Sequence, residues 1–430
     1  MSSPEMIRGF SKLDRKNKVK KISEWIQDDE LEEFLHSFRL DDAPAQQTFE
    51  KFSENTLSNY HLPWGIVPNV LIDGNLFHVP VVIEESSVVA AASKAASFWA
   101  LRGGFQTVFI NTIKKGQLHF TFRGDKNQLL EEWESIASLI KEKTSSITRN
   151  MEKRGGGIKA MHLRKLPQLS ENYYQIDIEA DTADSMGANF INSVLEQIGR
   201  TLPEVINVII PNSKVDVLMA ILSNYTPDSI VKMKVEAPVE KMTWYKDMSA
   251  GDFVRRMRWA ADIAWHDVSR AVTHNKGIFN GIDAVVLSTG NDFRAVEASG
   301  HAFASHTGQY RALSRVEIKD DIFSLKTEVP MALGTVGGLT KLHPLACKTL
   351  QILKNPDAKT LMKIATAVGL ANNFAAMASL VTTGIQQGHM KMHLHNIIQS
   401  LNIDPSLIPA IEEHFKGKTI SVSAVREFIE

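Results

Sequence analysis

The sequence predicts an α+β protein in which a ferredoxin-like unit interrupts a larger unit of mixed helices and strands. Two observations lead to this fold class. A strand–helix–strand–strand–helix–strand order covers residues from about 107 to 211, which is the split βαβ arrangement. Mixed helices, short strands and glycine turns lie on both sides of it. We therefore expect a large unit in two parts, a small ferredoxin-like unit and a helical C-terminal flap: 1–106 with 215–383, 107–214, and 384–430.

Composition excludes several classes of protein. The 430 residues carry 48 basic and 49 acidic side chains, a balance that argues against a nucleic-acid-binding protein. Cys347 is the single cysteine, so one chain can build neither a disulfide framework nor a cysteine zinc site. The first residues lack a signal-peptide pattern, and the best apolar run, 79–101, is broken by Glu84, Glu85 and Lys94. We expect a cytoplasmic protein with no membrane span.

The first hundred residues predict helices followed by a strand pair and another helix. Residues 1–60 have apolar side chains at helical spacing, typical of an amphipathic arm. The basic run 15–21 is either a solvated face or a contact for an anionic ligand. Asp73-Gly74-Asn75 reads as a turn between two strands, the second at 77–83, and an alanine-rich helix follows from about Ser87.

The small unit has a clear order of elements. Asp125 is a natural N-cap for its first helix, and short apolar runs mark its strands. The expected elements are strand 117–122, helix 126–143, strands 158–163 and 173–178, helix 184–199 and strand 205–210.

Two clusters of charged residues could carry chemistry. Glu84-Glu85 ends a strand directly before an apolar helix, so burial could bring one carboxyl into acid–base range. Alternatively, the pair is favoured by the helix dipole alone. Lys276, between Asn275 and Gly277 in an expected turn before a strand at 284–288, could steady an oxyanion or be an exposed loop lysine.

The stretch Gly388-His389-Met390 to His393 is the most unusual. His389 and His393 are spaced i, i+4, which puts them on one helical face and makes a metal pair conceivable. An HExxH motif is missing, however, and no third ligand is near in sequence. A single catalytic histidine on a flap and a plain surface helix are the competing interpretations.

Together, the motifs resemble the hydroxymethylglutaryl-CoA (HMG-CoA) reductases, specifically the soluble bacterial class. The resemblance runs through almost the whole chain and depends on several ordered motifs rather than on any single one. They are Val79 to Glu85 with Ser87 to Ala92, Asp184 to Asn189, Arg270 to Gly281, Thr289 to Asp292, Gly334 to Gly338, Asn373, and Gly388 to Met390.

The resemblance implies an NAD(P)H-dependent oxidoreductase that reduces HMG-CoA to mevalonate and CoA with two hydrides, and it implies roles for four catalytic residues. Lys276 would stabilise the oxygen anion, and Glu85, with Glu84 as the near alternative, would donate a proton. Asp292 would link the lysine and the glutamate by hydrogen bonds. His389 would protonate the departing CoA thiolate.

Binding residues follow from the same resemblance. Substrate contacts are expected from Ser87, Arg270, Asn280 and Asn373, with Arg270 pairing with the HMG carboxylate. The dinucleotide would bind on the small unit at a helix start, and Lys159 would favour the 2′-phosphate of NADPH over NADH. The expected cofactor residues are Asp184, Met186, Gly187, Asn189 and Lys159.

The resemblance also implies a homodimer or a multiple of dimers with a shared active site, and no metal. The direction of the reaction stays open between mevalonate synthesis for isoprenoids and oxidative mevalonate breakdown. A histidine-based metal-dependent hydrolase is the rival function. One departure from the family pattern is that Ser86 stands where a proline is common between Glu85 and Ser87.

Overall fold

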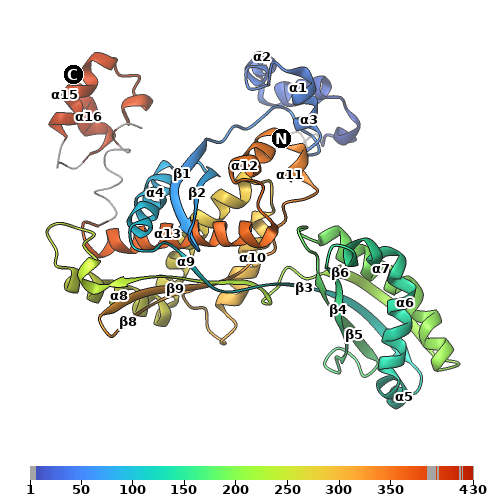
Figure 1. The fold of residues 1–430 in the computed structure, drawn as a ribbon. Helices are drawn as coiled ribbons and strands as arrows, with labels where there is room; N and C mark the ends of the chain where they lie inside the picture. Colours follow the sequence, from blue (N-terminus) through green and yellow to red (C-terminus); the bar gives the residue numbers. More distant parts are fainter. Residues whose placement is uncertain (1–5, 385–393, 395–396, 416–417, 419, 430) are drawn as a thin grey trace.

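The computed structural model describes residues 6–384, 394, 397–415, 418 and 420–429. The chain forms a large body, a smaller unit at one end of it, and two helical groups at the chain termini (Figure 1). This agrees with the predicted mixture of helices and strands.

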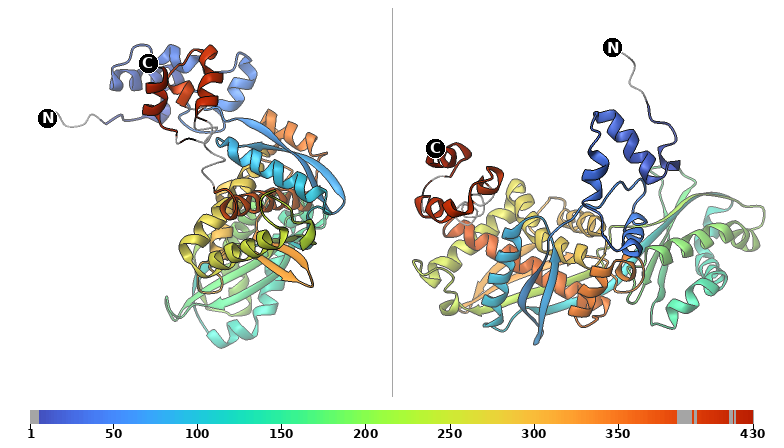
Figure 2. Two further views of the ribbon diagram at one scale, coloured as in Figure 1. Left: turned by 90° about the vertical axis from the view of Figure 1, so that its left-hand side faces the viewer. Right: turned by 90° about the horizontal axis from the view of Figure 1, so that it is seen from above.

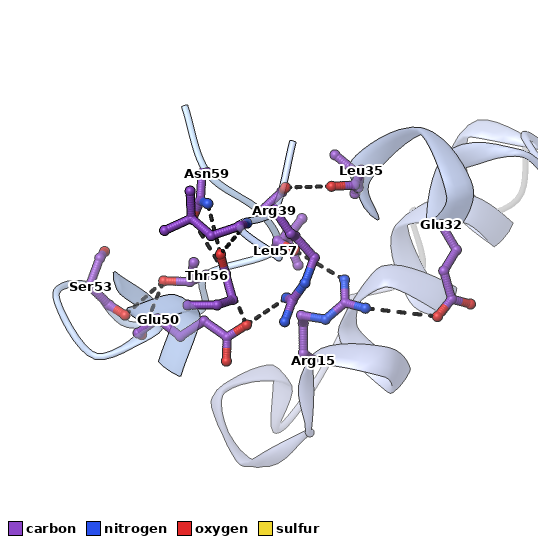
Figure 3. A network of polar contacts seen from close by, with 12 residues as sticks. Arg15, Glu32, Leu35, Arg39, Glu50, Ser53, Thr56, Leu57 and Asn59 are labelled. Atoms are coloured by element: carbon purple, nitrogen blue, oxygen red, sulfur yellow. Dashed lines mark hydrogen bonds and ion pairs between the residues drawn. The ribbon is translucent and has the colours of Figure 1, made fainter. Parts of the chain in front are cut away.

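The N-terminal group is helical, as its apolar spacing predicts. It contains η1 (Phe10–Lys12), α1 (Arg15–Ile26), α2 (Leu31–His36) and α3 (Ala43–Glu50). Polar contacts join parts of this group (Figure 3): Arg39 pairs with Glu50 at 2.5 Å, and Arg15 donates to the carbonyl of Leu57 at 3.2 Å. One cation of the basic run therefore has a structural role.

A strand pair and an alanine-rich helix lead into the body. Strands β1 (Trp64–Ile72) and β2 (Asn75–Val82) are antiparallel around the predicted turn at residues 73 and 74. Helix α4 (Ser86–Ala100) buries Ala92, Ala95 and Ala96. These small side chains let α4 approach closely, and it contacts β1 and the long helix α13 (Ala358–Val381). The alanine face is therefore covered within the chain.

One long strand belongs to both units. The first part of β3 (Gln106–Arg123) pairs with β7 (Ser229–Pro238), and the second part pairs with β5 (Tyr173–Asp181) and β6 (Lys214–Leu222). The strands of the sheet follow in the order β4 (Gly157–Lys165), β5, β3, β7, β9 (Ile322–Pro330) and β8 (Ser314–Lys319), and β6 lies beside β3. In Figure 1, β3 runs from the body into the small unit, so the two units share one continuous backbone support.

The small unit has the predicted order of elements, with one strand displaced. Helices α5 (Lys126–Glu131) and α6 (Trp133–Glu152) follow the Asp125 cap, then come β4 (Gly157–Lys165), β5 and α7 (Ala188–Ile209). The strand expected at 205–210 is wrong, because α7 continues through it and β6 closes the sheet. Val205 and Ile206 are buried while Val208 is 66% exposed, as expected for one face of a helix. In the sequence, this short apolar run cannot be distinguished from a strand.

The rest of the body consists of long helices packed on antiparallel strands. Helix α9 covers Val268–Ser288, so the predicted strand at 284–288 and the turn at Lys276 are wrong. Residues 284–286 are all buried. A helix that is buried on every side has apolar residues on all its faces, so its sequence lacks the helical spacing of apolar residues. The remaining elements are η2 (Val239–Lys241), α8 (Ala250–His266), α10 (Phe293–Ala304), β8 (Ser314–Lys319), β9 (Ile322–Pro330), α11 (Leu339–Leu342) and α12 (Pro344–Ile352).

Helix α13 crosses the body and is the most apolar of the long helices. An 18-residue window of this helix has a mean hydropathy of 1.5, which would suit a membrane span. However, 78% of that window is buried inside the protein. Within the described part of the chain, it is the one helix that passes this test. It forms the centre of the main core, so its apolar character is explained by packing.

The C-terminal group packs around a small core of its own. Its described elements are η3 (Pro405–Leu407), α15 (Ile408–His414) and α16 (Val422–Ile429), and Ile411, Phe415 and Val425 are buried among them. Figures 1 and 2 show this group lying apart from the small unit, beyond the end of α13. A helical C-terminal segment was predicted.

Candidate active site

A cavity of about 640 Å³ lies between α4, α9 and α13. Helix α9 contributes residues at 270, 273, 277 and 280, a spacing that keeps them on one face of the helix. Several residues predicted from sequence therefore line the same space. They are Glu85, Ser87, Arg270, Lys276, Asn280 and Asn373.

The charged centre of the cavity is formed by Lys276 and Glu85. The ammonium nitrogen Nζ of Lys276 lies 3.8 Å from Oε2 of Glu85. The hydroxyl of Ser87 donates a hydrogen bond to the other oxygen, Oε1. The two ionic side chains are 63% and 38% exposed, so a ligand entering the cavity can reach both.

Local structure explains why Glu85 points into this space. Glu85 is the N-cap position of α4, with an extended backbone, φ −103° and ψ 106°. Its carboxylate bonds to the side chain of Ser87, and it does not cap the helix with its side chain within the described structure. The carboxylate is therefore turned toward Lys276. Glu84 does not line the cavity as described, so the geometry favours the second carboxylate of the pair.

A buried polar chain supports α9 beside Lys276. Nε2 of His274 lies 2.6 Å from Oγ of Ser314, and this hydroxyl donates to Oδ1 of Asn373 at 2.8 Å. Since the serine proton goes to Asn373, His274 must donate from Nε2. Complete burial, together with the positive charge of Arg270, lowers the pKa of His274 to about 3, so the ring is neutral.

Asparagine side chains fix the neighbouring backbone. Nδ2 of Asn373 donates to the carbonyl of His274 at 3.2 Å, and Nδ2 of Asn372 donates to the carbonyl of Val88 at 3.0 Å. Asn373 thus connects α13 to α9, and Asn372 connects α13 to α4. The helix that carries both asparagines sets the distance across the cavity.

Asp292 lies elsewhere in this structure. Its carboxylate caps α10 by accepting from the backbone N–H of Arg294 and Ala295, and it pairs with the Arg294 side chain at 3.0 Å. Among the described residues, no bond joins it to Lys276 or Glu85. The link expected between these three groups is therefore not formed here, because Arg294 and the helix end satisfy Asp292.

The predicted cofactor residues gather at the start of α7. Asp184 and Met186 lie in the turn before the helix, Gly187 is its N-cap and Asn189 is in its first turn. Gly187 has φ 96°, which a residue with a side chain rarely adopts. Lys159, on β4, donates to the carbonyls of Gly155 and Gly156 at 3.2 and 3.3 Å, so it closes the glycine turn.

The metal hypothesis finds no support in the described residues, where no group of three histidine, cysteine or carboxylate side chains is placed to hold an ion. His389 and His393 lie outside those residues, so the structure leaves their roles untested.

Sequence reasoning missed several residues of the site. Lys94 lines the cavity, and its place seven residues after Ser87 on one helix face could have indicated this. Its ammonium lies 4.2 Å from the centre of the Trp244 ring. The contact of Ser314 with His274 could not be foreseen, because it joins distant parts of the chain.

Comparison with known proteins agrees with this geometry. The family model of hydroxymethylglutaryl-coenzyme A reductase matches residues 14–394. The 3-hydroxy-3-methylglutaryl-coenzyme A reductase of Archaeoglobus fulgidus is 35% identical over 396 residues, covering 91% of this chain and 86% of its own length. A probable enzyme of the same name from Borreliella burgdorferi is 31% identical, with 92% and 89% covered.

Solved structures give the same result. The class II 3-hydroxy-3-methylglutaryl-CoA reductase of Streptococcus pneumoniae, described as bound to NADPH in open conformations, is 33% identical with a TM-score of 0.72. It covers 88% of this chain and 100% of its own. A second structure from that organism is 32% identical, has a TM-score of 0.72 and covers 99% of each chain.

Proposed function

The chain belongs to the hydroxymethylglutaryl-coenzyme A reductase family, in its bacterial class, and from this premise we propose that the cavity between α4, α9 and α13 is its substrate site. The family reduces HMG-CoA to mevalonate with NAD(P)H, so the protein is an NAD(P)H-dependent oxidoreductase. The division of the chain into a substrate-binding body, a cofactor-binding small unit at 107–214 and a C-terminal flap is part of the proposal.

The observation that carries the proposal is the contact of Lys276 with Glu85 at the cavity. A thioester carbonyl gains negative charge on its oxygen when a hydride reaches its carbon. An ammonium placed beforehand at that oxygen stabilises the charge without reorganisation. We assign this role to Lys276, and to Glu85 the donation of a proton to the oxygen at the aldehyde stage. Ser87 holds the carboxylate in place for that transfer.

The cavity also suits an anionic substrate. Arg270 can take the HMG carboxylate through a bidentate pair, and Asn280 offers an amide to the polar atoms of the acyl group. Asn373 is buried and bonded to Ser314 and His274, so it positions α13 against α9 at the cavity. Lys94 at the same cavity adds a positive charge that we assign to the anionic CoA portion.

The start of α7 fits a nicotinamide dinucleotide. Within the described residues, this N-terminus has no side-chain cap, so its first backbone N–H groups remain available to a pyrophosphate. The dinucleotide, when bound, supplies the hydride. Asp184, Met186, Gly187 and Asn189 would shape this turn around it.

We propose NADPH over NADH as the preferred cofactor. Cations lie around the glycine turn 155–157, among them Lys153, Arg154 and Lys159, and they can pair with a 2′-phosphate. Lys159 bonds the carbonyls of Gly155 and Gly156, and the third N–H of its ammonium can be given to the phosphate. The related S. pneumoniae enzyme is described with NADPH.

The remaining parts of the proposal concern His389, Asp292 and direction. His389 would protonate the CoA thiolate, which otherwise attacks the aldehyde again. Asp292 would contribute only if its pair with Arg294 opens. Synthesis of mevalonate is the proposed direction, and oxidative mevalonate breakdown is the alternative with the same residues.

We also propose a cytoplasmic homodimer, or a multiple of it, with the active site near the subunit boundary. Apolar side chains at least 45% exposed lie on α8 and at the start of α9: Trp259, Ile263, Val268 and Val272. Val268 and Val272 flank Arg270, which lines the cavity. A partner covering them would bury apolar surface next to the substrate site.

Absorbance at 340 nm tests the function directly. Purified protein with HMG-CoA should consume about two NADPH for each free thiol released, as two hydride transfers require. Failure with both NADPH and NADH, and with mevalonate, CoA and NAD(P)⁺, would refute the assignment. A metal-dependent hydrolase would instead release thiol without cofactor and would lose activity with a chelator.

A further inference from the structure

Lys114 is a buried cation with no role in the chemistry above. It lies in the middle of β3 and is 3% exposed. Its ammonium donates to Oγ1 of Thr182, and to the carbonyl of Ser185 at 3.2 Å. Both acceptors belong to the turn 182–187, which precedes α7. Lys114 therefore ties the central strand of the small unit to that turn.

The turn is held tightly by its own polar groups. Oγ1 of Thr182 donates to the carbonyl of Ser185 at 2.7 Å, and Oγ of Ser185 donates back to the carbonyl of Thr182 at 3.0 Å. Ala183 has φ 47°, a left-handed conformation that costs energy for a residue with a side chain. Contacts from outside the turn therefore help to stabilise this strained conformation.

The body of the protein holds the other side of the turn. The backbone N–H of Thr335 donates to the carbonyl of Asp184 at 2.8 Å, and that of Ala358 donates to its carboxylate at 2.9 Å. A Cβ atom on Gly334 would lie 2.3 Å from the backbone nitrogen of Met186. The turn is thus clamped between the body and Lys114.

The ammonium of Lys114 also carries a positive charge beside the turn 182–187. Burial lowers its pKa to about 8, although the carboxylates of Asp181 and Asp184 act in the opposite direction. The other elements around the adjoining small cavity present uncharged residues, among them Ile191 of α7, Leu222 of β6 and Ala295 of α10. The positive charge lies close to the N-terminus of α7 and adds to its dipole.

We propose that Lys114 is a positioning residue for the dinucleotide: its charged ammonium holds the turn 182–187 in the form that presents the N-terminus of α7 to the pyrophosphate. This inference rests on the proposed function, because it requires the cofactor to bind at this turn. Neutral Lys114 would leave the carboxylates of Asp181 and Asp184 uncompensated beside an anionic ligand. Cofactor affinity should therefore fall at alkaline pH, while the HMG-CoA cavity is unaffected.

The test compares Lys114→Met with Lys115→Met. Lys115 is the matched control, since it is the next residue of β3, is partly exposed and pairs with Asp228 at 2.8 Å. The dissociation constant of NADPH is measured by fluorescence from about pH 7 to about pH 9.5, across the titration of a lysine with a lowered pKa. Steady-state assays give kcat and the KM values for NADPH and HMG-CoA.

The wild type and Lys115→Met should bind NADPH with constant affinity below about pH 8 and about tenfold more weakly toward pH 9.5. Lys114→Met should bind about tenfold more weakly at pH 7, the usual cost of losing a hydrogen bond from a charged group. Its affinity should not change with pH, and its KM for HMG-CoA should equal that of the wild type.

Two results would overturn the inference: a Lys114→Met variant with the wild-type pH profile, or one whose two KM values rise equally. If this variant does not fold, the wild type decides, because affinity that stays constant to pH 9.5 leaves no role for the charge. A wild type that binds no NADPH at any pH would instead refute the proposed function.

Discussion

The ammonium of Lys276 and the carboxylate of Glu85 lie 3.8 Å apart, on two helices that are far apart in sequence. Glu85 stands at the beginning of α4 and Lys276 in the interior of α9. Their approach depends on α13, which contacts both helices and bonds each of them through Asn372 and Asn373. The charge pair is thus a product of the main core, and changes to either residue should act on chemistry more than on folding.

Replacing Lys276 by alanine should reduce kcat by at least about a hundredfold, because the cavity loses the ammonium that we propose as the oxyanion stabiliser. Affinity for NADPH, measured by fluorescence titration, should stay at the wild-type value. Lys348→Ala, an exposed lysine on α12, is the control and should keep full activity. A Lys276→Ala variant with normal turnover would show that another group stabilises the oxygen.

Replacing Ser87 by alanine should lower kcat by about tenfold, the effect of losing a hydrogen bond to a charged group. The hydroxyl of Ser87 orients the Glu85 carboxylate, so the KM for NADPH should be unchanged. Ser93→Ala on the same helix is the matched control, since its hydroxyl bonds only to the carbonyl of Val89 in the described structure. Equal loss in both variants would indicate a general effect on α4.

How far the sequence predicts this site depends on the range of each interaction. Ser87 and Glu85 are neighbours at a strand–helix junction, and the motif around them indicates their role. The environment of Lys276 was predicted wrongly as a turn, because the apolar residues that follow it are buried on every side of a helix. The role expected of Lys276 comes from the resemblance of motifs, which does not depend on the local structure of the residue.

Contacts between distant segments could not be predicted. Ser314 bonds both His274 and Asn373, three residues on different elements, and nothing in the local pattern indicates a serine at the start of a strand. For Asp292, the motif suggests a contact with Lys276 that the described part of the structure does not contain. Its carboxylate pairs with the nearby Arg294 instead.

Replacing Asp283 by asparagine should stabilise the protein. Burial, together with the negative charge of Glu297, raises the pKa of Asp283 to about 8. The folded state therefore holds a proton that the unfolded carboxyl, with a pKa of 3.8, releases at neutral pH. This contribution is full at low pH and is lost as the pH rises toward 8. Asparagine needs no proton, so we expect a gain of at least about 1 kcal/mol at pH 7 in urea unfolding.

The gain for Asp283→Asn should be absent near pH 4 and should grow as the pH rises. Asp262→Asn on α8 is the control, since Asp262 lies 3.6 Å from Arg258 at the surface. Such surface pairs contribute little, at most about 1 kcal/mol. A gain that is constant with pH would mean that Asp283 is ionised in the folded protein.

Acid should destabilise the protein through His274. Its pKa is about 3 in the folded state, against 6.5 ordinarily, so below pH 6.5 the unfolded chain binds a proton that the buried ring does not. The stability contribution is full above pH 6.5 and falls by about 1.4 kcal/mol per pH unit as the pH drops toward 3. At pH 5 the loss should reach about 2 kcal/mol.

His274→Gln, whose amide can still donate to Ser314, should lose less stability between pH 7 and pH 5 in urea unfolding. Parallel curves for the two proteins would show that His274 takes up a proton in the folded state.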